Sequence, residues 1–160
     1  MSGALVDEPA TPGELDRCEE LIDSWLGSQL AENPVVAAVE RGEPGERRWY
    51  VRLTGEQKSV FSIWFTLAQR CLHYETYVMP APEQNHAELF EHLLRRNLKM
   101  NGVAFAVGAE DAVFLVGRIP VRSVDEGELD RVLGSLYAYT EQYFGPAMRI
   151  GYGAKFKGSP

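Results

Sequence analysis

Apolar side chains recur at intervals of three or four residues in three stretches of the chain, which is the period of an amphipathic helix. The first and third stretches begin at Thr11 and Asp125, and each of these residues is followed three positions later by a glutamate, as in a helix N-terminus. Pro34 and Pro146 mark the ends of the same two stretches. We therefore expect three helices, over Thr11 to Asn33, Asn85 to Asn101 and Asp125 to Gly145.

Five other stretches alternate apolar and polar positions, as a half-buried strand does. Their limits are 48–54, 58–67, 70–79, 103–107 and 112–119. The connectors within each group of strands are short, so mostly antiparallel pairing is expected. The sequence thus predicts an α+β fold of order α-β-β-β-α-β-β-α, in which three helices pack on one mostly antiparallel five-stranded sheet. This domain spans residues 11–153, between a flexible acidic arm (1–10) and a flexible tail (154–160).

The two faces of the predicted sheet differ in composition. One face, with Phe61, Ile63 and Phe65, is apolar and suits packing against helices. The other face mixes aromatic rings with charged and hydrogen-bonding groups, a combination that protein-binding surfaces favour. Its candidate contact residues are Tyr50, Arg52, Trp64, His73, Glu75 and Tyr77. The alternative is that a helix or a second subunit simply covers this face.

Charge and composition narrow the choice of partner. The chain has 160 residues, enough for one domain with a sizeable core. It carries 16 Lys and Arg against 23 Asp and Glu, a net charge of −7, and residues 1–46 alone hold 11 acids and 2 bases. Such an acidic segment repels phosphate backbones, so no nucleic-acid partner is expected. No stretch reaches the ~18 apolar residues of a membrane helix and the N-terminus does not resemble a signal peptide, so we expect no membrane partner and a cytoplasmic location.

One predicted strand brings potential metal ligands together. His73 and Glu75 share a face of the strand, and Cys71 is the one obvious third ligand on that face. Catalytic zinc sites use three protein ligands, but the same three residues could equally face a protein partner. The chain also contains no nucleophile elbow, phosphate-binding loop or redox pair of cysteines. We therefore expect no enzyme activity, no metal site and no cofactor.

Several stretches resemble the YbjN-domain family. They are RRWYVRLTG, LLRRNLKMNGVAF and VFLVGRIP, followed by the helix that Asp125 caps, and the likeness spans roughly residues 15–150. This family is described as bacterial sensory transduction regulators. The resemblance implies the fold of type III secretion chaperones, small α/β proteins that commonly dimerise and bind extended segments of client proteins, although a shared fold does not transfer a function. Asn97, within the second stretch, is expected to be a buried amide that bonds backbone groups.

These observations favour a non-enzymatic, homodimeric YbjN-like module, chaperone-like or regulatory, that binds a protein partner or client segment on its second sheet face. Trp64 and Tyr77 would anchor the partner, and Tyr50 would extend the contact. Arg52 and Glu75 would set the polarity of the contact. A small-ligand sensor, a purely structural dimer and, least favoured, a metal-dependent enzyme are the alternatives.

Overall fold

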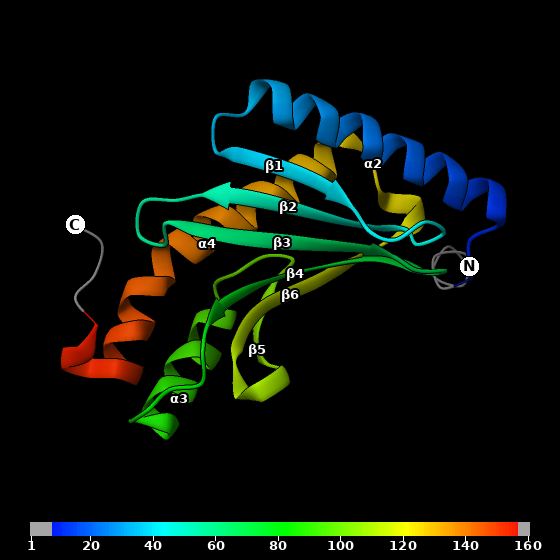
Figure 1. Ribbon diagram of the computed structural model, residues 1–160. Helices are drawn as coiled ribbons and strands as arrows, with labels where there is room; N and C mark the ends of the chain where they lie inside the picture. The colour runs from blue at the N-terminus through cyan, green and yellow to red at the C-terminus, as the bar shows by residue number, and fades with distance from the viewer. Residues whose placement is uncertain (1–7, 157–160) are drawn as a thin grey trace.

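Six strands form one antiparallel sheet in the computed structural model, which describes residues 8–156 (Figure 1). The strands are β1 (Val36–Arg41), β2 (Arg48–Thr54), β3 (Val60–Leu67), β4 (Cys71–Met79), β5 (Ala104–Val107) and β6 (Val113–Pro120). They lie in the order β1-β2-β3-β4-β6-β5. The helices are α2 (Pro12–Glu32), α3 (His86–Asn97) and α4 (Glu126–Tyr152), with short 3-10 helices η1 (Ala109–Asp111), η2 (Val121–Ser123) and η3 (Gly153–Lys155).

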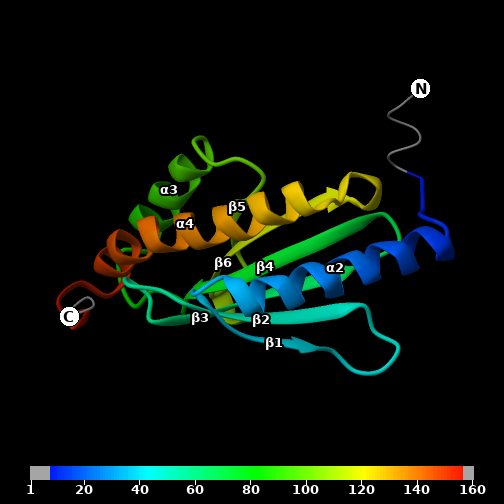
Figure 2. The same cartoon turned by 90° about the horizontal axis from the view of Figure 1, so that it is seen from above.

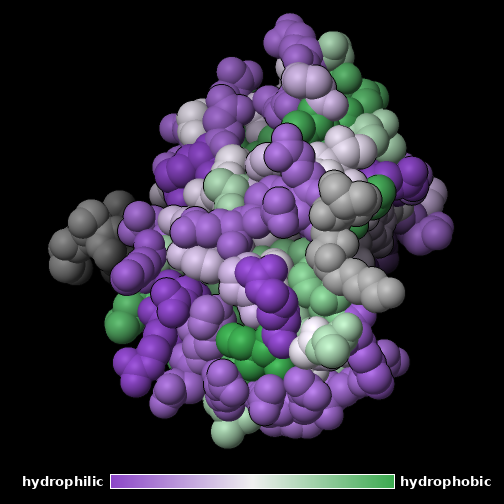
Figure 3. All heavy atoms as spheres, turned by 90° about the vertical axis from the view of Figure 1, so that its left-hand side faces the viewer, coloured by the Kyte–Doolittle hydropathy of each residue, from purple (hydrophilic) through white to green (hydrophobic). Residues whose placement is uncertain are grey.

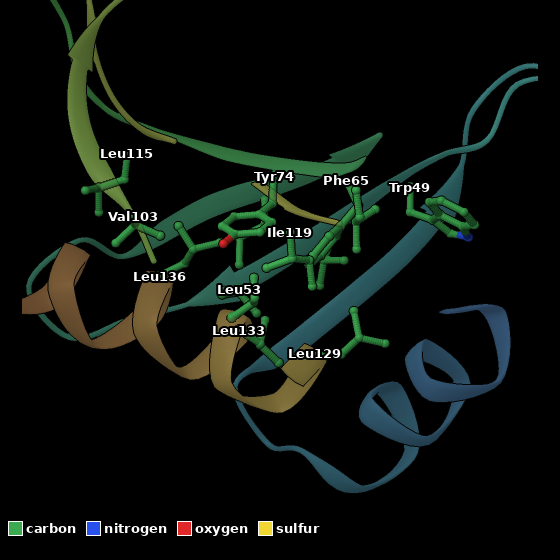
Figure 4. Packing of buried hydrophobic residues seen from close by; sticks show 14 of the residues in the cluster. Trp49, Leu53, Phe65, Tyr74, Val103, Leu115, Ile119, Leu129, Leu133 and Leu136 are labelled. Atoms are coloured by element: carbon green, nitrogen blue, oxygen red, sulfur yellow. The ribbon is translucent and has the colours of Figure 1, made fainter. Parts of the chain in front are cut away.

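The helices α2, α3 and α4 lie on one face of the sheet (Figure 2). Alternate strand residues point toward the helices. Apolar side chains from the strands and the helices together form the core between the two layers (Figure 4). The most deeply buried of these side chains include Trp49, Leu53, Phe65, Tyr74, Leu115, Leu129 and Leu136. The predicted α+β fold is therefore confirmed, and no helix of the described chain covers the opposite sheet face.

The first and last helices begin as their sequences predict. The Thr11 hydroxyl oxygen accepts a hydrogen bond from the Glu14 N–H (3.2 Å), and the Glu14 carboxylate accepts one from the Thr11 N–H (2.9 Å). Likewise, the Glu128 N–H of α4 donates to the Asp125 carboxylate (2.8 Å). Each carboxylate or hydroxyl group satisfies backbone donors that the helix itself leaves free.

The middle helix, α3, begins next to the predicted Asn85 but ends before the predicted stop. Asn85 precedes it with a left-handed φ of 55° and does not cap it; its amide donates instead to the Ile150 carbonyl oxygen of α4 (3.0 Å). The helix ends at Asn97, ahead of the predicted stop at Asn101. The Asn97 amide bonds backbone groups as expected, accepting from the Phe105 N–H (2.7 Å) and donating to the Phe105 carbonyl oxygen (3.4 Å). The residue is half-buried, not fully buried as predicted.

Strand β1 was not predicted and raises the strand count from five to six. It forms one edge of the sheet and pairs with β2, where Val39 lies opposite Val51. Ala37 favours strands weakly, and a register shift between Val36 and Ala38 breaks the alternation that marks a strand in sequence. Pairing with β2 therefore fixes this strand more than its own pattern does.

Helix α4 continues through Pro146, which corrects the predicted stop at Gly145. A proline inside a helix removes one backbone donor and usually ends or kinks the helix. Here the last turn is held by a loop that is distant in sequence: the N–H groups of Glu83 and Gln84 donate to the Gly151 carbonyl oxygen (3.0 and 3.1 Å). These tertiary hydrogen bonds hold the part of the helix that follows the proline.

The described chain extends slightly past its helices at both ends. Ala10 is buried and its N–H donates to the Gln69 carbonyl oxygen (2.7 Å), while the Phe156 ring packs edge-on against Phe144 (5.7 Å). Residues 1–7 and 157–160 of the predicted arm and tail lie outside the described residues, so the domain limits stay a prediction.

The end of the molecule seen in Figure 3 is mainly hydrophilic, with apolar side chains exposed in separate groups. None of the described helices combines the length and apolar composition needed to cross a membrane.

Candidate functional site

The sheet face opposite the helices, which we call the open face, brings four of the six candidate residues together. Across the strands, Tyr50 lies opposite Trp64, and Trp64 lies opposite Glu75. His73 is two residues along β4 from Glu75, opposite Thr66. These residues share the open face because their immediate chain neighbours point into the core.

Trp64 lines two hollows on the open face. The larger has a volume of about 340 Å³ and is lined by Arg48, Tyr50, Trp64, Thr66 and Glu75. The smaller, of about 170 Å³, is lined by Trp64, Thr66, His73, Tyr74, Glu75, Val116 and Gly117. A side chain seated in either hollow would therefore contact the half-buried indole ring.

Polar groups surround this indole ring. A hydrogen bond with Tyr50 and the charges of nearby carboxylates raise the pKa of Arg48. Arg118 of β6 lies opposite His73 in the sheet. The cluster thus offers an aromatic surface, guanidinium donors and the Glu75 carboxylate, which together can pack against and hydrogen-bond a polypeptide segment.

The other two candidate residues, Arg52 and Tyr77, lie outside both hollows. Tyr77 is 36% exposed, but its ring packs edge-on against Phe114 with the ring centres 5.6 Å apart. The Lys58 ammonium lies 4.8 Å from the centre of the same ring and donates to the Tyr77 carbonyl oxygen (2.9 Å). Burial lowers the pKa of Lys58 to about 8. Tyr77 is thus already engaged by its own chain, and Trp64 is the better placed anchor.

Sequence reasoning missed the contribution of β6 to the open face. This strand pairs with β4, so Val116 lies opposite Glu75 and Phe114 lies opposite Tyr77. The alternation of exposed and buried positions along β6 does indicate a two-sided strand. It does not indicate which strand lies beside it, because α3 and β5 separate β4 from β6 along the chain.

The three potential metal ligands of β4 do share the open face. Cys71, His73 and Glu75 follow one another at every second position of the strand. Among residues 8–156, no three or more His, Cys, Asp or Glu side chains form a group that could hold a metal ion.

Two solved complexes of type III secretion proteins contain chains of similar structure. A chain of the heterodimeric ExoU–SpcU complex from Pseudomonas aeruginosa aligns with a TM-score of 0.52 at 15% identity, covering 79% of this chain and 96% of that chain. A chain of the complex between the Yersinia pestis chaperone SycH and a fragment of YscM2 aligns with a TM-score of 0.48 at 19% identity, covering 73% of this chain and 94% of that one. The ExoU–SpcU likeness shows a shared fold, that of type III secretion chaperones.

Sequence relatives occur in mycobacteria. The chain is 31% identical over 108 residues to uncharacterized protein ML2442 of Mycobacterium leprae (strain TN), covering 68% of this chain and 59% of that protein. It is 29% identical over 102 residues to uncharacterized protein Rv0487 of Mycobacterium tuberculosis (strain ATCC 25618 / H37Rv), covering 64% of this chain and 56% of that protein. The chain therefore spans less than two thirds of the length of these relatives.

A family model also matches residues 23–146, which contain the whole sheet, all of α3 and parts of α2 and α4. The model is YbjN, described as "Putative bacterial sensory transduction regulator". The resemblance seen in the sequence is thereby confirmed, and the chain belongs to the YbjN family.

Proposed function

We propose that this protein is a non-enzymatic, homodimeric module that binds an extended segment of another protein on its open face. The observation that carries the proposal is the position of Trp64 between two side-chain-sized hollows on a sheet face that no described helix covers. The SpcU chain, which shares the fold, forms a heterodimer with ExoU, and this supports a protein as the ligand. The cytoplasmic location stays a prediction from the sequence.

Binding at the open face would depend on a few central groups. Interfaces concentrate their binding energy in buried aromatic and arginine side chains, so Trp64 would supply most of the apolar contact. Arg48 and Tyr50 would donate hydrogen bonds to the segment on one side of the ring. Glu75 would accept hydrogen bonds on the other side and set the direction of the segment.

Capture of partners from a bacterial lysate, with identification by mass spectrometry, tests this proposal. Replacement of Trp64 by Ala should abolish the capture of a specific protein, because it removes the central anchor. The matched control is Leu30→Ala, which shortens an equally apolar side chain, 47% exposed, on α2. If the Trp64→Ala variant captures the same proteins as the control, the open face is not the binding site. If it becomes monomeric instead, the face is a structural dimer contact.

For the homodimer, the exposed ridge of α3 is the surface that fits best. Leu94 of α3 and Leu98, directly after its last residue, are 65% and 87% exposed and lie four residues apart. Next to them an apolar hollow of about 370 Å³ is bounded by Phe90, Phe105 and Val107. Leucines so exposed beside an apolar hollow are typical of an interaction surface.

The charges on α3 are suited to pairing with a second copy of the same helix. Glu88 and Glu91 lie in its first half, whereas Arg95, Arg96 and Lys99 lie in or just after its second half. In an antiparallel pair around a two-fold axis, the acidic half of each helix meets the basic half of its partner. The helix dipoles also oppose each other in this arrangement.

Sedimentation of charge variants tests this dimer. Leu98→Glu should give a monomer that remains folded, as circular dichroism would show, because the side chain is 87% exposed and contributes little to the fold. Arg95→Glu should weaken the dimer, and mixing it with a Glu91→Arg variant should restore association as a heterodimer. A Leu98→Glu protein that sediments as a dimer would place the interface elsewhere.

A further inference from the structure

The helix layer contains its own groove, between the C-terminal end of α2 and the middle of α4. Its volume of about 560 Å³ is the largest of the hollows described here and lies within the range of ligand sites. Val35, Leu133 and the Tyr137 ring give it an apolar lining, whereas Glu32 and Asp130 line it with carboxylates. Among residues 8–156, no lysine or arginine lines it. The open face is built from strands, so this groove is a separate surface.

Two carboxylates, Glu32 and Asp130, give the groove its negative charge. The Trp25 indole N–H donates to Asp130 Oδ1 (2.8 Å), and the Gln29 amide donates to the same oxygen (3.4 Å), which fixes this carboxylate in place. Burial and the charges of Glu141 and Glu56 raise the pKa of Tyr137. The groove therefore suits a ligand that combines positive charge with aliphatic surface.

Gly134 of α4 lines the groove without placing a side chain in it. A Cβ atom at this position would meet no other atom within 4 Å, so packing does not require a glycine here. Glycine inside a helix lowers stability relative to alanine. Gly134 leaves the helix backbone without a side chain at this point, which allows another chain to approach closely.

We propose that this groove binds a basic segment of a partner polypeptide. The lysine or arginine head groups would pair with Glu32 and Asp130, and the aliphatic stems would lie over Leu133 and the Tyr137 ring. A volume of this size holds a few residues of chain rather than one side chain. This site goes beyond the proposed open-face function, and either can hold without the other.

The three tryptophans allow a direct test, because each indole reports on a different place. Trp25 bonds to Asp130 beside the groove, Trp49 bonds to Asp23 (2.7 Å) in the core, and Trp64 lies on the open face. The ¹⁵N-labelled protein is titrated with the peptide acetyl-Lys-Leu-Lys-Leu-Lys-amide. We expect a saturable shift of the Trp25 indole signal while the other two stay in place. The acidic peptide acetyl-Glu-Leu-Glu-Leu-Glu-amide should leave all three unchanged.

Two sets of variants separate a specific site from general attraction to an acidic protein. Glu32→Gln with Asp130→Asn keeps the acceptor for Trp25 but removes both charges, and should raise the dissociation constant about tenfold. The matched control, Glu20→Gln with Asp111→Asn, changes net charge equally at exposed positions outside the groove and should leave binding unchanged. Gly134→Leu should block the groove without lowering the melting temperature. The proposal is overturned by equal losses in the charge variant and its control, by a shift of Trp64 alone, or by no saturable shift.

Discussion

At the scale of single residues, the two cysteines occupy contrasting environments. Cys18 is buried on the core side of α2, and burial raises its pKa to about 11. Cys71 is only partly buried at the start of β4, on the open face. Because the thiolate is the reactive form, burial makes Cys18 unreactive both by blocking access and by raising its pKa, and the more accessible Cys71 is expected to react first.

This contrast predicts the thiol reactivity of the folded protein. At about pH 8, an aromatic disulfide reagent should modify Cys71 rapidly and Cys18 only when the protein unfolds. Absorbance of the released thiolate gives both rates, and a Cys71→Ser variant should lose the fast phase. Equal rates for the two thiols in the folded state would contradict the burial of Cys18.

Among the elements, α4 and β6 use glycine for different reasons. At Gly117 of β6, a Cβ atom would overlap the Gly102 carbonyl oxygen and the Tyr74 ring, whose hydroxyl donates to that same oxygen (2.8 Å). A glycine is therefore needed at position 117 of β6, because the Tyr74 ring packs directly against its Cα atom. At Gly134 of α4, by contrast, the space is empty.

Alanine at these two positions should consequently have opposite effects on stability. Gly117→Ala should lower the free energy of unfolding by about 2 kcal/mol, because a close-packed site must be displaced. Gly134→Ala should raise it by about 1 kcal/mol through helix propensity alone. Urea denaturation measures both, and two changes of the same sign would contradict the packing described for one of the sites.

Local signals predicted the elements well, and non-local pairing explains where they failed. The capping residues Thr11 and Asp125 act within one turn, so sequence alone identifies them. The continuation past Pro146 depends on a loop more than sixty residues earlier in the chain, which no local pattern reveals. For the candidate site, alternation along β4 placed His73 and Glu75 on one face. The neighbouring β6 residues were missed because strand order is a property of the whole sheet.

Across the whole molecule, the carboxylates of α2 pair with arginines that lie outside this helix. Arg41 pairs with Glu19 and Asp23 of α2, and Arg47 pairs with Glu19 as well. Arg122 of η2 bonds to the Glu14 carboxylate at 3.0 Å, 108 residues away in sequence. The uneven charge of the sequence is thus used to hold α2 against the rest of the fold.

One of these contacts should make stability depend on acidity. The hydrogen bond from the Thr11 N–H, and after it the contact with Arg122, lowers the pKa of Glu14 below its ordinary value of 4.5. A lowered folded-state pKa stabilises the fold above about pH 4.5, and this contribution is lost as the pH falls through the folded value. Thermal melts between about pH 6 and pH 3 should show a smaller loss of stability for Glu14→Gln than for the natural chain. Identical pH profiles would contradict this role.

The hydrogen bond from the Asn85 amide to the Ile150 carbonyl oxygen links the start of α3 to the last turns of α4. Asn85, the residue directly before α3, is held by the last turns of α4. Shortening the protein after Phe144 would remove these turns, and we expect α3 to lose its position as a result. If the chain dimerises through α3 as proposed, this truncation should therefore weaken the dimer. Loss of the dimer after such a truncation, with the open face still able to bind its target, would show that the end of α4 affects dimerisation from a distance.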